Sequence, residues 1–276
     1  MRYYMTRMKG IDVSHWQGLI DWDTLKKSTD ISFAIIRVGV GTKKDKYFNS
    51  NVAKALAANI YCGVYVYSKA TSPEEATEEA DFVIKSIKSY NIRFPVYYGI
   101  EDSRQLRLTN EERTALITSF CDRISAAHYI PGVYANTNWF NTKFNLNLLK
   151  KYEKWIAHLG VTAPSYDGAY GMWQYSSTGK VDGIEGDVDL DYCYINYLAY
   201  PQNFKIGTKL ILNNVPLYTS SIRKEPSSTI NGTYYIYDGI AMNNRFRITE
   251  LKKNINTLPI SEKVTGYVKL SDLFIK

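Results

Sequence analysis

The first 190 residues alternate short apolar runs with helical patterns, and this alternation limits the possible folds more than any other feature. Runs such as Phe33–Val38 and Tyr61–Ser68 are apolar at consecutive positions, which is typical of strands buried on both faces of a parallel sheet. Strands that alternate with helices favour an α/β fold. The predicted strands are Gly10–Ser14, Phe33–Val38, Tyr61–Ser68, Pro95–Glu101, Pro131–Asn136, Lys154–Leu159, Gly171–Tyr175 and Asp187–Leu190.

Helix signals lie between the early strands. Ser72-Pro73-Glu74-Glu75 and Thr109-Asn110-Glu111-Glu112 are capping boxes, each followed by apolar residues at helical spacing. Weaker helical patterns cover Asp23–Lys27, Asn51–Ala58 and Leu146–Tyr152. After about Leu159 the helical patterns stop, and loops rich in Gly, Ser, Thr and Asp join the last strands. Five strand–helix units followed by three more strands predict a modified TIM-like (β/α)5β3 barrel.

From Phe204 the pattern changes to short alternating strands separated by Gly, Asn, Pro and Ser. Such a pattern predicts a small all-β domain. With Tyr200–Asn203 as linker, the expected domains are residues 1–199 and 204–276. The predicted strands of the second domain are Lys209–Leu212, Thr233–Tyr237, Phe246–Thr249 and Thr265–Lys269.

The net charge of +7 is concentrated in the second domain. Residues 201–276 contain 11 Lys and Arg against 5 Asp and Glu, whereas residues 1–200 contain 23 against 22. This excess indicates an anionic partner: a wall polymer, a nucleic acid or a membrane surface. An ordinary soluble surface explains the charge equally well.

Several classes of site and location are disfavoured. Three widely separated cysteines form no CxxC pair, and three scattered histidines form no HExxH motif, so we expect no metal site. No phosphate-binding Gly-rich loop follows a strand, and we expect no cofactor. The start, MRYYMTRMKG, lacks an apolar core, and no apolar run could span a bilayer. We therefore expect neither a secretory signal nor membrane insertion.

Three carboxylates stand at strand ends. Asp12, Glu101 and Asp189 come from the first, fourth and last predicted strands of the barrel, and such ends meet at one mouth. Glycoside cleavage needs one protonated carboxyl and others ionised to stabilise positive charge. A lone Asp at a strand end is more often a cap or loop anchor. The residues expected to contact substrate around them are Arg37, Tyr65, Tyr67, Tyr134, Trp155, Trp173 and Gln174.

Several motifs in this barrel resemble glycoside hydrolase family 25, the Chalaropsis-type lysozymes. They include the opening segment Gly10–Gly18 (GIDVSHWQG) followed by IDW, and the strand FAIIRVG. Further matches are GVY, WQYSS, VDGI and VDLD, which with the others cover most of residues 9–195 in the family's order.

The resemblance implies hydrolysis of the β-1,4 bond between N-acetylmuramic acid and N-acetylglucosamine in peptidoglycan. Glu101 is then the proton donor, and Asp12 and Asp189 are acidic residues of the cleft. The nucleophile is either the substrate's own acetamido group or, in an inverting route, water. One position departs from the family, whose fourth strand ends Asp-x-Glu, because here Gly99 takes the place of the Asp. We therefore expect weakened catalysis.

The tail resembles bacterial SH3-like wall-binding repeats of clostridial phage lysins, in segments such as Phe204–Gly207, Gly232–Tyr235 and Arg245–Thr249. Together the two resemblances indicate a phage endolysin, held in the host cytoplasm until release and then acting on the cell wall. Its expected partners are peptidoglycan and, through the tail, an anionic wall polymer. A bacterial autolysin, a catalytically inactive peptidoglycan-binding protein and a nucleic-acid binder are the alternatives, in that order, and we expect no nucleic-acid partner.

Overall fold

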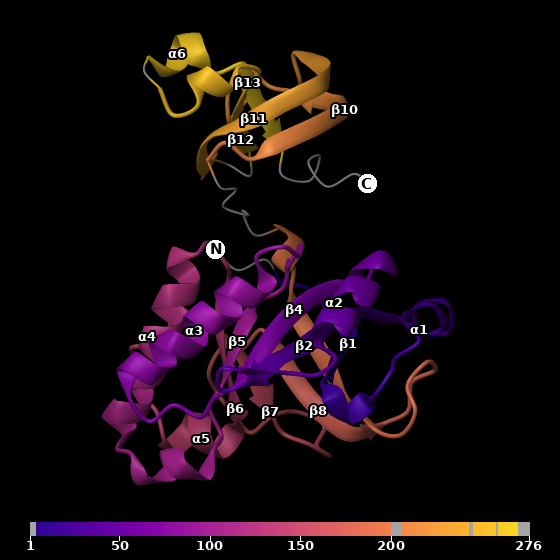
Figure 1. The fold of residues 1–276 in the computed structure, drawn as a ribbon, viewed down its shortest axis with the longest axis vertical. Helices are drawn as coiled ribbons and strands as arrows, with labels where there is room; N and C mark the ends of the chain where they lie inside the picture. Colours follow the sequence, from indigo (N-terminus) through magenta and orange to yellow (C-terminus); the bar gives the residue numbers. More distant parts are fainter. Residues whose placement is uncertain (1–3, 200–205, 243–244, 258, 270–276) are drawn as a thin grey trace. The chain divides into compact units, whose positions relative to one another are not determined.

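The computed structural model describes residues 4–199, 206–242, 245–257 and 259–269. The chain divides into two compact units, Met1–Tyr197 and Leu198–Lys276 (Figure 1). Each unit contains its own β-sheet. The two units are described separately below.

The first unit is built on a closed barrel. Its sheet has the order β1-β9-β8-β7-β6-β5-β4-β2-β3, and β1 also pairs with β2 to close the ring. β3 is a two-residue appendage on β2. The other pairs are parallel except those of β9, which runs antiparallel to both β1 and β8. The strands are β1 (Tyr4–Val13), β2 (Ile31–Val40), β3 (Lys43–Lys44), β4 (Tyr61–Tyr67), β5 (Val96–Gly99), β6 (Pro131–Asn136), β7 (Glu153–Ala157), β8 (Met172–Gly179) and β9 (Val188–Ile195).

Helices pack on the outside of β2, β4, β5 and β6 (Figure 1). The predicted capping signals begin two of them: Ser72 accepts a hydrogen bond from Glu75 N, and Thr109 exchanges two with Glu112. Each cap satisfies amides that the first helical turn leaves unpaired. The helices are α1 (Trp22–Ser28), α2 (Phe48–Ala57), α3 (Pro73–Ile87), α4 (Asn110–Ala126) and α5 (Thr137–Thr142), with 3-10 turns η1 (His15–Gln17), η2 (Ser103–Arg107) and η3 (Tyr197–Ala199).

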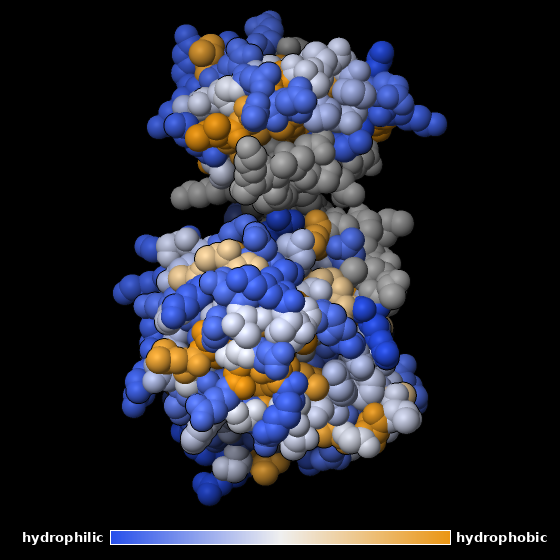
Figure 2. All heavy atoms as spheres, turned by 90° about the vertical axis from the view of Figure 1, so that its right-hand side faces the viewer, coloured by the Kyte–Doolittle hydropathy of each residue, from blue (hydrophilic) through white to orange (hydrophobic). Residues whose placement is uncertain are grey.

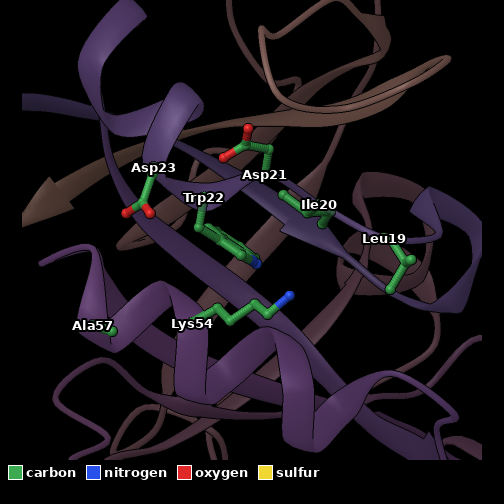
Figure 3. Close-up of a pocket in the computed structure, with 7 residues that line it drawn as sticks. All are labelled: Leu19, Ile20, Asp21, Trp22, Asp23, Lys54 and Ala57. Carbon is green, nitrogen blue, oxygen red and sulfur yellow. The ribbon is translucent and has the colours of Figure 1, made fainter.

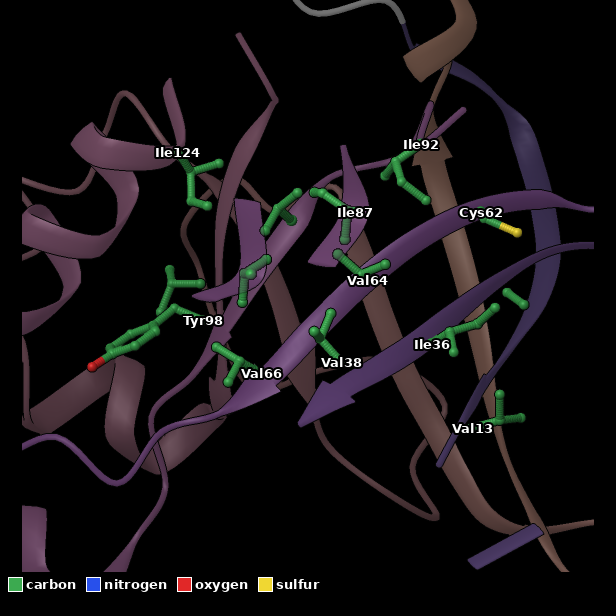
Figure 4. Close-up of a cluster of buried hydrophobic side chains, with 14 of the residues drawn as sticks. Val13, Ile36, Val38, Cys62, Val64, Val66, Ile87, Ile92, Tyr98 and Ile124 are labelled. Carbon is green, nitrogen blue, oxygen red and sulfur yellow. The ribbon is translucent and has the colours of Figure 1, made fainter. Parts of the chain in front are cut away.

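Alternate residues of each strand face opposite sides of the barrel wall. On β4, Cys62, Val64 and Val66 belong to the apolar layer beneath the helices, which Figure 4 shows together with Ile36 and Val38 of β2. The residues between them have the opposite orientation. Because of this alternation, the side chains that face outward are mainly aliphatic, and those that face inward are mainly aromatic and polar. The inward-facing side chains form the candidate active site described below.

One predicted element of the barrel was wrong, and another was predicted too short. Leu146–Tyr152 forms turns closed by hydrogen bonds three residues apart, such as Leu149 N to Leu146 O, in place of a helix. The last strand is longer than Asp187–Leu190, and the antiparallel direction of β9 was not anticipated. Helix α5 was not predicted, because its N-cap Asn136 is also the last residue of β6.

The second unit contains a four-stranded antiparallel sheet of order β10-β11-β12-β13, which confirms the all-β prediction. The predicted strands Lys209–Leu212 and Thr233–Tyr237 are parts of longer ones. Leu210, Ile236, Phe246, Ile248 and Val268 are among the buried residues of its core. The elements are β10 (Lys209–Leu217), β11 (Ser228–Met242), β12 (Arg245–Thr249), β13 (Gly266–Lys269), η4 (Lys252–Asn254) and α6 (Ile260–Lys263).

The face drawn in Figure 2 is mainly hydrophilic, with apolar residues in small patches. Such scattered apolar exposure is ordinary for a folded protein. Among the described residues, no helix is both long and apolar enough to cross a membrane.

Candidate active site

One pocket of about 230 Å³ gathers the predicted carboxylates at a single mouth of the barrel. It also contains every predicted substrate-contact residue except Trp173. That indole donates from Nε1 to His158 O at 2.9 Å and packs on Tyr175 and Tyr192. The residues that line the pocket are Asp12, Ser14, Trp16, Gln17, Arg37, Tyr65, Tyr67, Glu101, Tyr134, Trp155, Gln174 and Asp189.

Glu101 lies two residues beyond β5 and lines the pocket. Burial, with the charges of Asp189 and Asp102 adding to it, raises the pKa of its carboxyl to about 7. A carboxyl with this pKa is largely protonated in mildly acidic solution. Glu101 is therefore suited to donate a proton to a leaving oxygen.

Asp12 and Asp189 face each other across the β1–β9 pair. Asp12 is only 4% exposed and accepts a hydrogen bond from Gln174 Nε2 at 2.7 Å. Burial and the neighbouring charges of Asp191 and Asp189 raise its pKa well above the ordinary range. Burial also raises the pKa of Asp189. Like charges this close oppose full ionisation, so the cluster retains protons that an isolated Asp would lose.

Asp191 is a member of this cluster that the sequence analysis did not select. It is fully buried and accepts a hydrogen bond from Trp155 Nε1 at 2.7 Å. The signal was present, since Asp189 and Asp191 are two residues apart and therefore project to the same side of β9. Asp191 thus fixes the indole of Trp155 from beneath the pocket.

Arg37 is already engaged within the protein. Its Nε and Nη2 donate to Asp45 Oδ2 at 2.9 and 2.8 Å, and Nη2 also contacts His15 Nδ1. His15 N donates to the same Asp45 oxygen at 3.0 Å. Arg37 therefore lines the pocket while also holding the His15–Gln17 turn in position.

The aromatic residues of the pocket differ in what they can offer a ligand. Tyr65 and Tyr134 pack against Trp155, with ring centroids 5.7 and 4.4 Å apart, and Tyr134 OH donates to Gln174 Oε1 at 2.9 Å. Trp16 is 78% exposed at the rim. An exposed indole face can stack on a sugar ring. Together with Ser14 and Gln17, Trp16 lines the pocket but was not among the predicted site residues.

A side chain at position 99, where the chain has Gly99, would extend toward the carboxyl of Glu101. A Cβ placed on Gly99, the last residue of β5, would lie 3.6 Å from Glu101 Oε1 and 3.0 Å from Val66 O. A carboxylate at position 99 would therefore stand beside Glu101. The contact with Val66 O would require β4 and β5 to shift by a few tenths of an ångström.

Asp102 makes structural contacts and does not substitute for the carboxylate that is missing at position 99. It caps η2 through Arg104 N and forms ion pairs with Lys69 and Arg104. Burial opposes ionisation of Asp102, but the hydrogen bonds from Lys69 and Arg104 outweigh it and lower its pKa below the usual range. Asp102 is therefore a structural anion.

A second hollow, of about 410 Å³, lies outside the barrel where α1 meets α2 (Figure 3). Of its two carboxylates, Asp21 accepts hydrogen bonds from Thr24 as the N-cap of α1. It contains neither Glu101 nor the Asp12 cluster. Convergent carboxylates therefore identify the smaller pocket as the candidate active site.

The sequence matches the family described as Glycosyl hydrolases family 25 over residues 11–184, most of the barrel unit. The chain belongs to glycosyl hydrolase family 25. This membership places its first unit among glycoside hydrolases of the lysozyme type, and the family's barrel agrees with the observed fold.

Individual relatives agree with this assignment. The chain is 34% identical to Lysozyme M1 of Streptomyces globisporus over 197 residues, or 66% of each protein, so the match leaves about a third of that lysozyme uncovered. It is similar to the CTP1L endolysin, with a TM-score of 0.62 and 26% identity over 70% of this chain and 68% of that one. It also resembles the autolysin LytC of Streptococcus pneumoniae, solved with a synthetic peptidoglycan ligand (TM-score 0.62, 27% identity, 68% and 47% coverage).

Proposed function

We propose that the barrel of this family 25 member hydrolyses the β-1,4 bond between N-acetylmuramic acid and N-acetylglucosamine in peptidoglycan. The observation that carries the proposal is the convergence of Glu101, Asp12 and Asp189 in one pocket with an exposed indole at its rim. Similarity to a lysozyme and to an autolysin solved with a peptidoglycan ligand supports the substrate class.

In this mechanism Glu101 donates its proton to the glycosidic oxygen as the bond breaks. Positive charge then develops on the sugar, and the carboxylate of Asp189 at the mouth stabilises it. Asp12, whose pKa burial and the charges of Asp191 and Asp189 raise, accepts the hydrogen bond of Gln174 Nε2 and so orients that side chain. Substrate-assisted attack by the acetamido group and direct attack by water both use the same proton donor.

Gly99 weakens this machinery by leaving out one carboxylate beside Glu101. A missing electrostatic stabiliser of a transition state typically costs about 100-fold in rate. The same feature favours the second candidate function, a peptidoglycan-binding protein without hydrolytic activity. Activity of the chain itself separates the two candidates.

The test is release of new muramic-acid reducing ends from purified peptidoglycan by the given chain and by Gly99→Asp. We expect slow release by the given chain and release faster by up to about 100-fold in the variant. Gly99→Asn and Gly99→Ala are controls, because they add bulk at the same position without charge. If neither the chain nor Gly99→Asp releases ends, the binding protein is the correct function; equal rates would show that Gly99 is not a weakness.

We further propose that the chain is a phage-type endolysin that accumulates in the host cytoplasm and then degrades the wall. Its similarity to the CTP1L endolysin supports this origin. The test uses a bacterium whose purified wall the chain cuts. Its cells should tolerate the chain in their cytoplasm. Their turbidity should fall, as a sign of lysis, once chloroform permeabilises the membrane. Lysis without permeabilisation would contradict this location.

For the second unit we propose a wall-binding role of the SH3-like type with an anionic wall polymer as partner. The excess of 11 Lys and Arg over 5 Asp and Glu in residues 201–276 supports it. The four-stranded antiparallel sheet fits an SH3-like unit.

A further inference from the structure

The β12–β13 pair of the second unit places two cations directly opposite each other. Arg245 pairs in register with Lys269 on the antiparallel neighbour. Phe246 and Val268, the adjacent residues, are both fully buried in the core of this unit. Because side chains alternate along a strand, Arg245 and Lys269 project to the other face of the sheet. Like charges at directly opposite positions destabilise a strand pair.

Arg245 is buried with its hydrogen-bonding capacity only partly used. It is 6% exposed, and its Cζ lies 3.7 Å from the centre of the Tyr218 ring. Nη1 donates to Ser220 O at 3.0 Å, whereas the buried Nε has no hydrogen-bond partner in the described part of the chain. A buried guanidinium without an anion is costly, since burial removes the water that would solvate its charge.

Lys269 approaches the same aromatic ring. Its Nζ lies 5.1 Å from the centre of the Tyr218 ring, and Tyr218 itself is only 3% exposed. Both cations are therefore held against one buried ring. Within the described part of the chain, neither forms an ion pair with a carboxylate.

The neighbouring arginine of β12 shows how this fold neutralises a cation when it does so internally. Arg247 lies on the same face of the strand as Arg245, two residues away, and its Nη1 is 2.7 Å from Asp238 Oδ2. Both side chains of that pair are largely buried. Among the described residues, no acid takes the place of Asp238 beside Arg245 and Lys269.

We propose that Arg245, Lys269 and Tyr218 form an oxyanion-binding site for the phosphate or carboxylate groups of an anionic wall polymer. The bound oxyanion supplies negative charge to two cations that have no carboxylate partner among the described residues, with the planar guanidinium and the ammonium as donors. Tyr218 holds the guanidinium in place through its ring. This site rests on the wall-binding role proposed above, and it identifies the residues of the second unit that would bind the polymer.

The test measures binding of the full chain to soluble poly(glycerol phosphate) and, separately, to polygalacturonate, by calorimetry at 50 mM NaCl. Arg245→Gln and Lys269→Gln each remove one charge from the site. Lys209→Gln removes one charge from an exposed position on β10 and is the matched control. Circular dichroism melting of each variant shows that it is folded; Lys269, which is only partly buried, provides the test if Arg245→Gln does not fold.

We expect at least tenfold weaker polymer binding in the site variants and less than twofold change in Lys209→Gln, with inorganic phosphate competing for the wild type. The polymer that binds identifies the source: a phosphate polymer, a carboxylate polymer or both. Equal weakening by all three substitutions, or no binding of either polymer by the wild type, would overturn the site.

Reducing-end release from peptidoglycan stripped of attached polymers keeps this result separate from the muramidase proposal. We expect the same rate in wild type, Arg245→Gln and Lys269→Gln, because the substituted residues belong to the second unit. If neither the wild type nor Gly99→Asp releases reducing ends, the muramidase is refuted and the anion site is unaffected. Normal release with unchanged polymer binding in the site variants would refute the anion site alone.

Discussion

Glu101 shows how the surroundings of one residue determine its chemistry. The same side chain on a surface would be ionised at neutral pH and useless as an acid. Burial, assisted by the charges of Asp189 and Asp102, raises its pKa from an ordinary 4.5 to about 7. A substantial fraction of Glu101 therefore retains, near neutral pH, the proton that glycosidic cleavage needs.

The pH dependence of activity follows from this pKa. We expect the rate to fall about tenfold for each pH unit above 7, because the ionised carboxylate cannot protonate the leaving oxygen. Glu101→Gln should reduce the rate by about 100-fold or more and remove this limb of the profile. Reducing-end release from pH 4 to 9 measures both; a wild-type profile that is flat between pH 6 and 9 would exclude Glu101 as the acid.

The same pKa makes a prediction about stability. Because the folded-state pKa lies above the ordinary value of 4.5, the stability linked to Glu101 is fully present below about pH 4.5 and is lost as the pH rises through 7. At pH 8, Glu101→Gln should therefore be more stable than the wild type by on the order of 1 to 3 kcal/mol, with little difference at pH 4. Urea unfolding at the two pH values measures this, and equal stabilities at pH 8 would contradict the raised pKa.

At the scale of secondary-structure elements, N-capping residues determine where helices begin. Thr109 Oγ1 accepts from Glu112 N at 3.1 Å, and Thr109 N donates to Glu112 Oε2 at 2.7 Å. This reciprocal pair satisfies two amides at the start of α4. Strand β9 is controlled differently, because its direction depends on its pairing with β1 and β8.

Thr109→Ala should destabilise the protein by about 1 kcal/mol, since an N-cap hydroxyl is lost, while leaving reducing-end release unchanged. Thr118→Ala removes a hydroxyl from the middle of the same helix, where it bonds only to Ala115 O, and serves as the control. Chemical denaturation compares the two. A loss in the control as large as that in Thr109→Ala would show that the cap has no special role.

At the scale of the whole molecule, the chain divides into two compact units, and we propose that one cuts the wall and the other binds it. Each has its own sheet and its own buried core. We therefore expect that removal of one unit abolishes either cleavage or wall binding and leaves the other property intact.

We expect residues 1–197 alone to release reducing ends from polymer-free peptidoglycan at a rate within about twofold of the full chain, because all residues of the pocket are present. Retention on intact walls in a sedimentation assay should fall at least tenfold. Retention equal to that of the full chain would show that the barrel, and not the second unit, holds the wall.

The sequence by itself determined the barrel class, the caps of α3 and α4, and the set of carboxylates that meet in the pocket. These features depend on local periodicity, on end signals a few residues long and on motifs specific to a family. The arrival of Asp12 and Glu101 at one mouth follows from parallel strands ending on the same side.

Only the tertiary structure decided which residues act on one another. The antiparallel course of β9 brings Asp191 beneath Trp155 and sets Asp189 against Asp12, and no local pattern encodes that direction. Likewise, Arg245 meets Lys269 only through strand register. Proton affinities and unpaired charges depend on these long-range contacts, because burial and neighbouring charge exist only in the folded chain.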